Sequence, residues 1–152
     1  MELIAGRQTA LTKVRYIDSA YHITARDVVP DSQLEFKFDT GAISSFVTVG
    51  SMLGKNNVEK NRESINRAFE HYGEIGKLQT VFHSASDNEM FAYRVYAEDV
   101  MIGNIKLPIF YYWLSPMIDN RKLLLGDDFI RFCDFKHVHE SDIIIEDFKV
   151  DD

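Results

Sequence analysis

The sequence predicts a mainly antiparallel β domain with one inserted helix. Apolar and polar residues alternate within the first 50 positions, which is the period of half-exposed strands, and residues 78–114 return to strand character. Between these two blocks, residues 58–72 carry the one convincing helical period of the chain. With 152 residues the chain has room for a single domain, 1–152, and is too small for a two-lobed enzyme.

Two strand signals precede a polar turn near the N-terminus. Alternation around residues 14–23 predicts the N-terminal strands, within residues 1–32. Leu34, Phe36 and Phe38 then alternate with charged residues and predict a strand that ends at the polar turn 39–45. The short β-prone run 46–49 follows this turn.

The predicted helix has both end signals as well as the right period. Its apolar face consists of Val58, Ile65, Phe69 and Tyr72. Asn57 is a suitable N-cap and Gly73 a suitable C-terminal stop, so we expect a helix over 57–72. Because its apolar face is regular, covering the sheet is the favoured role, with shaping of a cleft as the alternative.

The second half of the chain returns to strands. Residues 78–83 and 90–100 flank a polar stretch, 84–89, and predict a β-hairpin. Gly103 and Asn104 predict another turn, after which 105–114 is apolar at nearly every position and predicts a strand covered on both faces. Residues 143–148 predict a last strand.

Composition and charge exclude several classes of protein. Lys and Arg number 17 against 24 Asp and Glu, a formal charge of −7, which argues against binding to nucleic-acid phosphates. A single cysteine excludes an intrachain disulfide framework and a zinc site made only of thiolates. The N-terminus shows no secretory pattern and no apolar run is long enough to span a bilayer, so we expect a cytoplasmic protein with no membrane partner.

One carboxylate stands at the end of an apolar strand, on a glycine turn. Phe36 and Phe38 fix the strand, so Asp39 is held in place while partly desolvated. Thr40 can lock the turn by hydrogen bonding, and Gly41 allows close approach of another backbone. Taken alone, Asp-Thr-Gly is a weak signal, and an ordinary surface turn is the favoured explanation.

A second segment changes that balance. Residues 123–125 are an apolar strand that leads into Gly126 and a short helical start, 128–130. Alone, this segment is typical of an ordinary buried strand followed by a turn. Together with Asp39 to Ala42 and the hairpin between them, it indicates a specific family.

These segments resemble the retropepsin-like aspartic proteases. In that family an Asp-[Thr/Ser]-Gly-[Ala/Ser] turn is followed by a flap hairpin, then by two apolar residues and a glycine that opens a short helix. The matching segments here are 39–42, 84–89 and 124–126, and the resemblance covers residues 33–148. It implies a closed antiparallel β-barrel with a flap hairpin, the inserted helix and a short helix after Gly126.

The resemblance implies a role for each residue of these segments. Asp39 would be the catalytic carboxylate of an aspartic endopeptidase. Thr40 would pin the turn against its counterpart in a partner subunit, and Gly41, in the turn that Ala42 completes, would hydrogen-bond the substrate backbone. Leu124, Leu125 and Gly126 would support the turn from beneath. The flap residues that would close over a bound peptide are Ser84, Ala85, Ser86, Asp87 and Asn88.

The chemistry of this reaction requires two carboxylates, which share one proton because like charges at short range cannot both ionise. This chain has a single Asp-[Thr/Ser]-Gly, since Asp18-Ser19 continues with Ala20 and Asp31-Ser32 with Gln33. One chain therefore supplies half of a site. We expect a two-fold homodimer that joins two Asp39 side chains and cuts a polypeptide substrate without a cofactor.

Three features depart from the family pattern. The flap tip offers Asp87 and Asn88 where many members have glycine. Ile43 and Asp127 stand where retroviral members carry an acid and an arginine, so that ion pair is absent. The helix 57–72 is an insertion relative to the shortest members.

Other candidate sites are weaker. Cys133, His137 and His139 share a strand face only if a strand begins by Cys133, and they lack a fourth ligand, so no metal is expected. The aromatic run 110–113 has no basic surround and is typical of core or cleft wall. Asp127 and Asp128 follow Gly126 and favour the start of a helix.

Two alternatives to the enzyme remain. The first is a non-catalytic module of the same fold that dimerises or binds peptides, for which Asp39→Asn would change nothing. The second is a plain β-barrel scaffold in which Asp-Thr-Gly occurs by chance.

Overall fold

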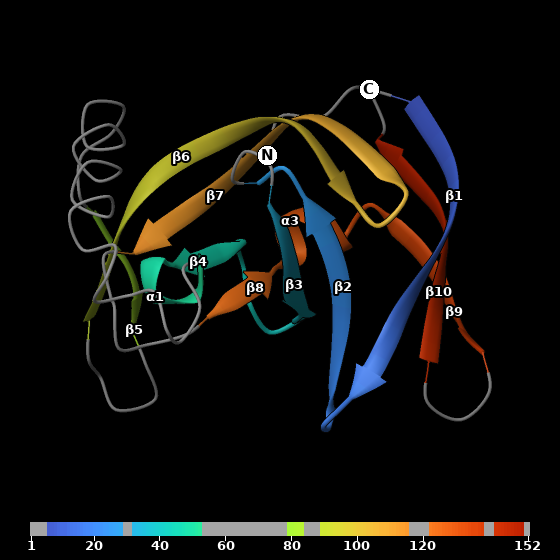
Figure 1. The fold of residues 1–152 in the computed structure, drawn as a ribbon, viewed down its shortest axis with the longest axis horizontal. Helices are drawn as coiled ribbons and strands as arrows, with labels where there is room; N and C mark the ends of the chain where they lie inside the picture. The colour runs from blue at the N-terminus through green and yellow to red at the C-terminus, as the bar shows by residue number, and fades with distance from the viewer. Residues whose placement is uncertain are drawn as a thin grey trace. The chain divides into compact units, whose positions relative to one another are not determined.

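The computed structural model describes residues 6–28, 32–52, 79–83, 89–115, 122–138 and 142–150. The chain is mainly β, with a closed six-stranded β-barrel and short helices, as the sequence predicts. In chain order the elements are β1 (Gly6–Ile17), β2 (Ala20–Arg26), β3 (Gln33–Phe38), β4 (Phe46–Thr48), α1 (Val49–Met52), β5 (Gln79–His83), β6 (Glu89–Ile102), β7 (Ile105–Ser115), β8 (Leu123–Leu125), α3 (Asp127–Ile130), β9 (Cys133–Val138) and β10 (Asp142–Val150) (Figure 1).

The chain forms two compact units. The first comprises Met1–Ser45, Tyr96–Tyr111 and Leu124–Asp152, and the second comprises Phe46–Val95 and Tyr112–Leu123. The strands β6 and β7 each contribute to both units. Every residue of the predicted active-site turn, 39–42, and of the predicted support, 124–126, belongs to the first unit.

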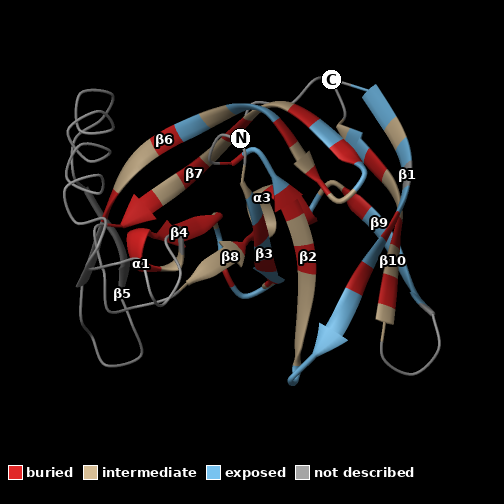
Figure 2. Ribbon diagram, in the orientation of Figure 1, coloured by how far each residue is buried: buried red, intermediate tan, exposed pale blue. Residues whose placement is uncertain are grey.

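The strands of the first unit follow the order β8-β3-β2-β1-β10-β9. All neighbours are antiparallel except β3 and β8, which run parallel with Phe38 opposite Leu125. Burial along β3 confirms the predicted alternation: Leu34, Phe36 and Phe38 are buried while the residues between them are exposed (Figure 2). The parallel pair was not part of the antiparallel prediction, and it is what brings the two predicted site segments together.

Aromatic contacts fill the interior of the first unit. Phe36 meets Phe110 edge-on, with ring centroids 6.2 Å apart. Phe129 of α3 stacks on Phe148 of β10 at 5.0 Å, and both side chains are buried. Edge-to-face and offset pairs of this kind add to the free energy gained by burying apolar area, so they fix α3 firmly.

The predicted turn at Gly103 is also present and packs against β1. Gly103 has a φ of 57°, and a Cβ there would lie 2.1 Å from Cγ2 of Thr12, so only glycine fits. The next residue, Asn104, donates its backbone N–H to Oγ1 of Thr12 at 2.9 Å. β1 has a register shift between Thr9 and Thr12, next to this contact.

In the second unit, β5 and β6 pair antiparallel, which confirms the predicted hairpin strands. β4 is buried at all three positions and pairs parallel with β7, Phe46 opposite Trp113 (Figure 2). Thr48 fixes the chain ahead of β8, because its N–H donates to the carbonyl of Lys122 at 2.9 Å. The guanidinium of Arg94 lies 5.1 Å from the ring centre of Trp113, within range of a cation–π contact.

The strand predicted to be covered on both faces, β7, is fully buried mostly at alternating positions, with half-buried residues and the exposed Lys106 between them. In β7, Ile105 and Leu107 are buried, and further along Phe110, Tyr112 and Leu114 are buried instead. The buried positions therefore change from odd to even between Leu107 and Phe110.

The predicted helix 57–72 lies outside the described residues. No helix within the described ranges is long and apolar enough to cross a membrane.

Candidate active site

Asp39 lies directly after the last residue of β3 and is half-buried. Its backbone N–H donates to the carbonyl of Leu125 at 3.0 Å, which extends the pairing of β3 with β8 by one residue. The buried side chain of Phe38 precedes it. The position of the carboxylate is therefore set by a strand that is fixed on one face by packing and along both edges by hydrogen bonds, to β2 and to β8.

The turn that follows closes on the Asp39 side chain. The N–H of Gly41 donates to Oδ1 of Asp39 at 2.9 Å, and the N–H of Ala42 donates to the Asp39 carbonyl at 3.2 Å. A Cβ on Gly41 would lie 3.2 Å from the same Oδ1, which is tighter than most contacts of this kind. Ala42 is buried, whereas Thr40 is exposed.

The predicted support segment lies against this turn. The N–H of Asp127 donates to the Ala42 carbonyl at 2.7 Å, and that of Asp128 donates to the Ile43 carbonyl at 3.2 Å. Leu125 is fully buried, and a Cβ on Gly126 would lie 2.6 Å from the carbonyl carbon of Ser44. The structure thus brings the two segments together, with glycine required at the point of closest approach.

Ser45 and Asp128 form a hydrogen-bonded pair that the sequence did not reveal. The Asp128 carboxylate accepts from the backbone N–H of Ser45 at 3.0 Å and from its hydroxyl at 2.9 Å. The Ser45 Oγ in turn accepts from the N–H of Gly126 at 3.2 Å. The two acids after Gly126 lie in the first turn of α3 as expected, but the Asp128 side chain binds Ser45.

Comparison with known proteins informs the fold. No family model matches the sequence, and no curated protein matches it significantly. Among solved structures, the chain is similar to a retropepsin-like aspartic protease from Rickettsia conorii, with a TM-score of 0.58 and 18% identity over 97% of this chain and 98% of that one. The fold is retropepsin-like. The predicted fold class is thereby confirmed.

Ile43 and Asp127 are the residues that replace the ion pair of the retroviral members, and the described part of the structure shows the surroundings of both. Ile43 is 75% exposed although its backbone is bonded to α3. Asp127 pairs with Arg131, one turn along the chain, at 2.8 Å. Retroviral members have an arginine at the position of Asp127. In this chain the position carries an acid instead, and its cationic partner is Arg131 of the same segment.

The predicted flap tip of the retropepsin-like fold is Ser84, Ala85, Ser86, Asp87 and Asn88, and it lies outside the described residues. The strands on either side pair antiparallel, with His83 opposite Glu89. The hairpin prediction is confirmed as far as these strands extend.

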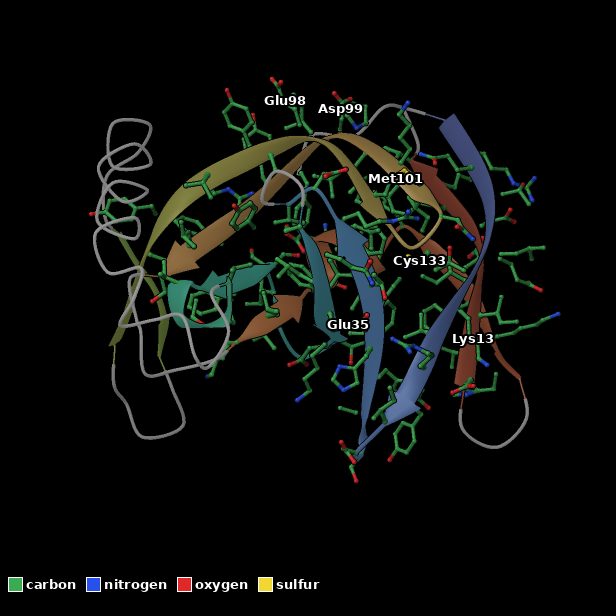
Figure 3. The ribbon with its side chains drawn as sticks, in the orientation of Figure 1. Lys13, Glu35, Glu98, Asp99, Met101 and Cys133 are labelled. Atoms are coloured by element: carbon green, nitrogen blue, oxygen red, sulfur yellow. The ribbon has the colours of Figure 1, made fainter. Side chains whose placement is uncertain are left out.

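The first unit carries other acids and a thiol, which differ from Asp39 in their surroundings. Glu98 and Asp99 are exposed on β6 and point to solvent (Figure 3). Cys133 lies at the start of β9, and burial, together with nearby Asp134, raises the pKa of its thiol to about 12 (Figure 3). Such a thiol is neither a nucleophile nor a metal ligand at neutral pH.

The metal hypothesis depended on a strand that begins by Cys133, and β9 does begin there. The Cys133 thiol, however, donates to the Phe129 carbonyl at 3.8 Å and is buried, whereas His137 is exposed. Within the described ranges no three His, Cys, Asp or Glu side chains are grouped to hold a metal ion. His139 lies outside those ranges.

Proposed function

We propose that this protein is an aspartic endopeptidase that acts as a two-fold homodimer. The observation that carries the proposal is the fixed Asp39 carboxylate, bonded at Oδ1 by the Gly41 N–H and anchored through its backbone to Leu125. The retropepsin-like fold supports it, because the chain matches a protease of that fold over nearly its whole length.

The proposed reaction uses one Asp39 from each of two subunits. The ionised Asp39 takes a proton from a water molecule, whose oxygen attacks the carbonyl carbon of the peptide bond. The other Asp39 gives its proton to the carbonyl oxygen as the tetrahedral intermediate forms. When the intermediate collapses, the C–N bond breaks, the leaving nitrogen takes a proton from the first Asp39, and the second Asp39 recovers its own. The pair then again holds one proton, as two adjacent carboxylates require.

The homodimer follows from the count of catalytic turns. Residues 39–41 are the single Asp-[Thr/Ser]-Gly of the chain, so a second carboxylate has to come from a second copy. The exposed Thr40 is the residue of the turn that we assign to the contact between subunits.

The proposed substrate is a polypeptide in an extended conformation. Main-chain hydrogen bonds, including those of the active-site turn, would hold it, and the flap residues 84–88 would close over it. The net charge of −7 gives no support to nucleic acid as a partner. The reaction needs no cofactor.

A peptide-library cleavage assay, run from acid to neutral pH, tests the function. We expect the wild type to cut peptides and Asp39→Asn to cut none while it remains folded and dimeric. The matched control is Asp18→Asn, which alters a carboxylate in the β1–β2 turn, where a φ of 51° suits asparagine equally well. A folded, dimeric wild type that cleaves nothing at any pH would overturn the protease proposal and leave the non-catalytic module.

A further inference from the structure

Ser45 stands at the far end of the turn that begins at Asp39, and it is completely buried. Its N–H and its hydroxyl each donate to a different oxygen of Asp128, at 3.0 and 2.9 Å. Its Oγ also accepts the N–H of Gly126 at 3.2 Å. Ser45 therefore joins the Asp128 side chain of α3 to the backbone of Gly126, which lies against the active-site turn.

The chemistry of the pair matches a carboxylate. An ionised aspartate is a pure acceptor with two oxygens, and Ser45 presents two donors to it. Hydrogen bonds to an ionised group are stronger than neutral ones, especially in a partly buried position such as this. Asparagine would offer a single, neutral acceptor oxygen, and its amide group could meet the serine hydroxyl only as a donor, on an oxygen that already accepts the Gly126 N–H.

These bonds lie in line with the backbone contacts of the turn. Asp39 is bonded to Leu125 at one end, and Ala42 and Ile43 are bonded to the first two residues of α3 in the middle. The Ser45 pair closes the other end. Residues 39–45 are thus held along their length by 125–128, and a shift at Ser45 is passed to Asp39 through a short, bonded segment.

We infer that Asp128 is a positioning residue for catalysis: through Ser45 it fixes the turn that aims the Asp39 carboxylate. The inference rests on the proposed function and adds a residue to it. The Asp128 carboxylate is bonded to Ser45, so it acts through the turn rather than on the reacting atoms. Because misplacement of a reacting group by about 1 Å can cost on the order of 100-fold in rate, loss of this support lowers kcat more than it raises KM.

The test uses four single variants of the 152-residue chain, one double variant and one control. Asp128→Ala removes both acceptors, Asp128→Asn removes one, Ser45→Ala removes the hydroxyl, and Ser45→Thr keeps it. The control, Glu146→Gln, removes a carboxylate of similar size from the exposed ion pair with Lys136. Peptide-cleavage rates are expressed per folded dimer, so a smaller folded fraction does not count as a catalytic effect.

We expect kcat to fall by about tenfold or more in Asp128→Ala and Ser45→Ala, with KM within about threefold of the wild type. The kcat of Asp128→Asn should lie between those of the wild type and Asp128→Ala. Ser45→Thr and Glu146→Gln should keep the wild-type kcat. The double variant Ser45→Ala/Asp128→Ala should lose no more than the worse single one, because the two residues act as a unit. Wild-type kcat in folded Asp128→Asn and Ser45→Ala would overturn the inference.

Backbone amide exchange gives a readout that does not depend on activity. Asp128→Asn and Ser45→Ala should speed exchange of the Gly126 and Gly41 amides by about tenfold, with β2 amides unchanged. If the wild type cleaves no peptide but this exchange changes, the proposed function fails while the positioning contact holds. Unchanged exchange rates at both glycine amides would overturn the positioning claim, whatever the activity. If the alanine variants do not fold, the same measurements on Asp128→Asn and Ser45→Thr still test the claim.

Discussion

The backbone N–H of Asp39 donates to the carbonyl of Leu125 at a distance of 3.0 Å. This bond joins two segments that lie far apart in the sequence, the Asp-Thr-Gly turn and the Leu-Leu-Gly segment. It belongs to the parallel pairing of β3 with β8, so the backbone that carries the carboxylate is bonded to the sheet rather than part of a mobile loop. A carboxylate held this way keeps its direction when a second one faces it, which the proposed reaction requires.

The two glycines of the site should respond differently to alanine. In Gly126→Ala the new Cβ would lie 2.6 Å from the carbonyl carbon of Ser44, so backbone must move and we expect a loss of about 1–3 kcal/mol in the free energy of unfolding. In Gly41→Ala the nearest atom is Oδ1 of Asp39 at 3.2 Å, so stability should change by less than about 1 kcal/mol while cleavage falls. Urea denaturation and kcat measurements check both. Equal loss of stability in the two variants would contradict this account.

The ion pair between β1 and β10 predicts an acid-dependent loss of stability. A hydrogen bond from Arg7 holds the pKa of Asp147 below its ordinary value of 3.8, and the two groups lie 2.6 Å apart. Because the folded-state pKa is the lower one, the contribution is present above about pH 4 and is lost as the pH falls below it. Asp147→Asn should therefore melt at a lower temperature than the wild type at pH 6. The difference in melting temperature should become smaller toward pH 2 and in high salt. A difference that does not depend on pH would contradict a stabilising ion pair between Arg7 and Asp147.

The thiol of Cys133 should be protected in the folded protein. Burial raises its pKa from an ordinary 9.0 to about 12, which lowers the thiolate fraction at pH 8 about a thousandfold. Reaction with an aromatic disulfide reagent should be at least about a hundredfold slower in native protein than in urea-unfolded protein. Since the raised value belongs to the folded state, its contribution to stability is complete below about pH 9 and is lost as the pH rises toward 12. Equal labelling rates in the two states would show that the thiol is accessible.

Thr40 should affect assembly more than folding. Its side chain is exposed within the described part of the subunit, and we assign it to the subunit contact. Thr40→Ala should weaken dimerisation, measured by sedimentation equilibrium, with little change in the melting temperature of the subunit. Thr40→Ser keeps the hydroxyl and should keep the dimer. A dimer unaffected by Thr40→Ala would place the contact elsewhere.

The strands and the site turn were predictable because local pattern decides them. Alternation over residues 34–38 determines which face of β3 is buried, and the glycine at 126 marks the place where two backbones approach closely. These are short-range signals that a single sequence contains. The same holds for the turn at Gly103, where φ is positive. At Gly41 the expected close backbone is not found among the described residues, and the nearest atom is Oδ1 of the Asp39 side chain.

The pair of Ser45 and Asp128 was not predictable from pattern. A serine before a strand and an acid in the first helical turn each have an ordinary local explanation, so nothing links them in sequence. Their contact depends on the parallel pairing of β3 with β8, which sets the register between distant segments. Contacts of this type follow from tertiary packing, and so the site residue that supports Asp39 at a distance appeared only in the structure.

The central claim is that one active site contains Asp39 from two subunits, and a subunit-mixing experiment tests it most directly. Wild type and Asp39→Asn are unfolded together in equal amounts, refolded to allow random pairing, and assayed for peptide cleavage. If both carboxylates are required, about one quarter of the dimers are active, so the activity per total subunit falls to about one quarter of the wild-type value. Activity of about one half would mean that each subunit works alone and would contradict the shared site.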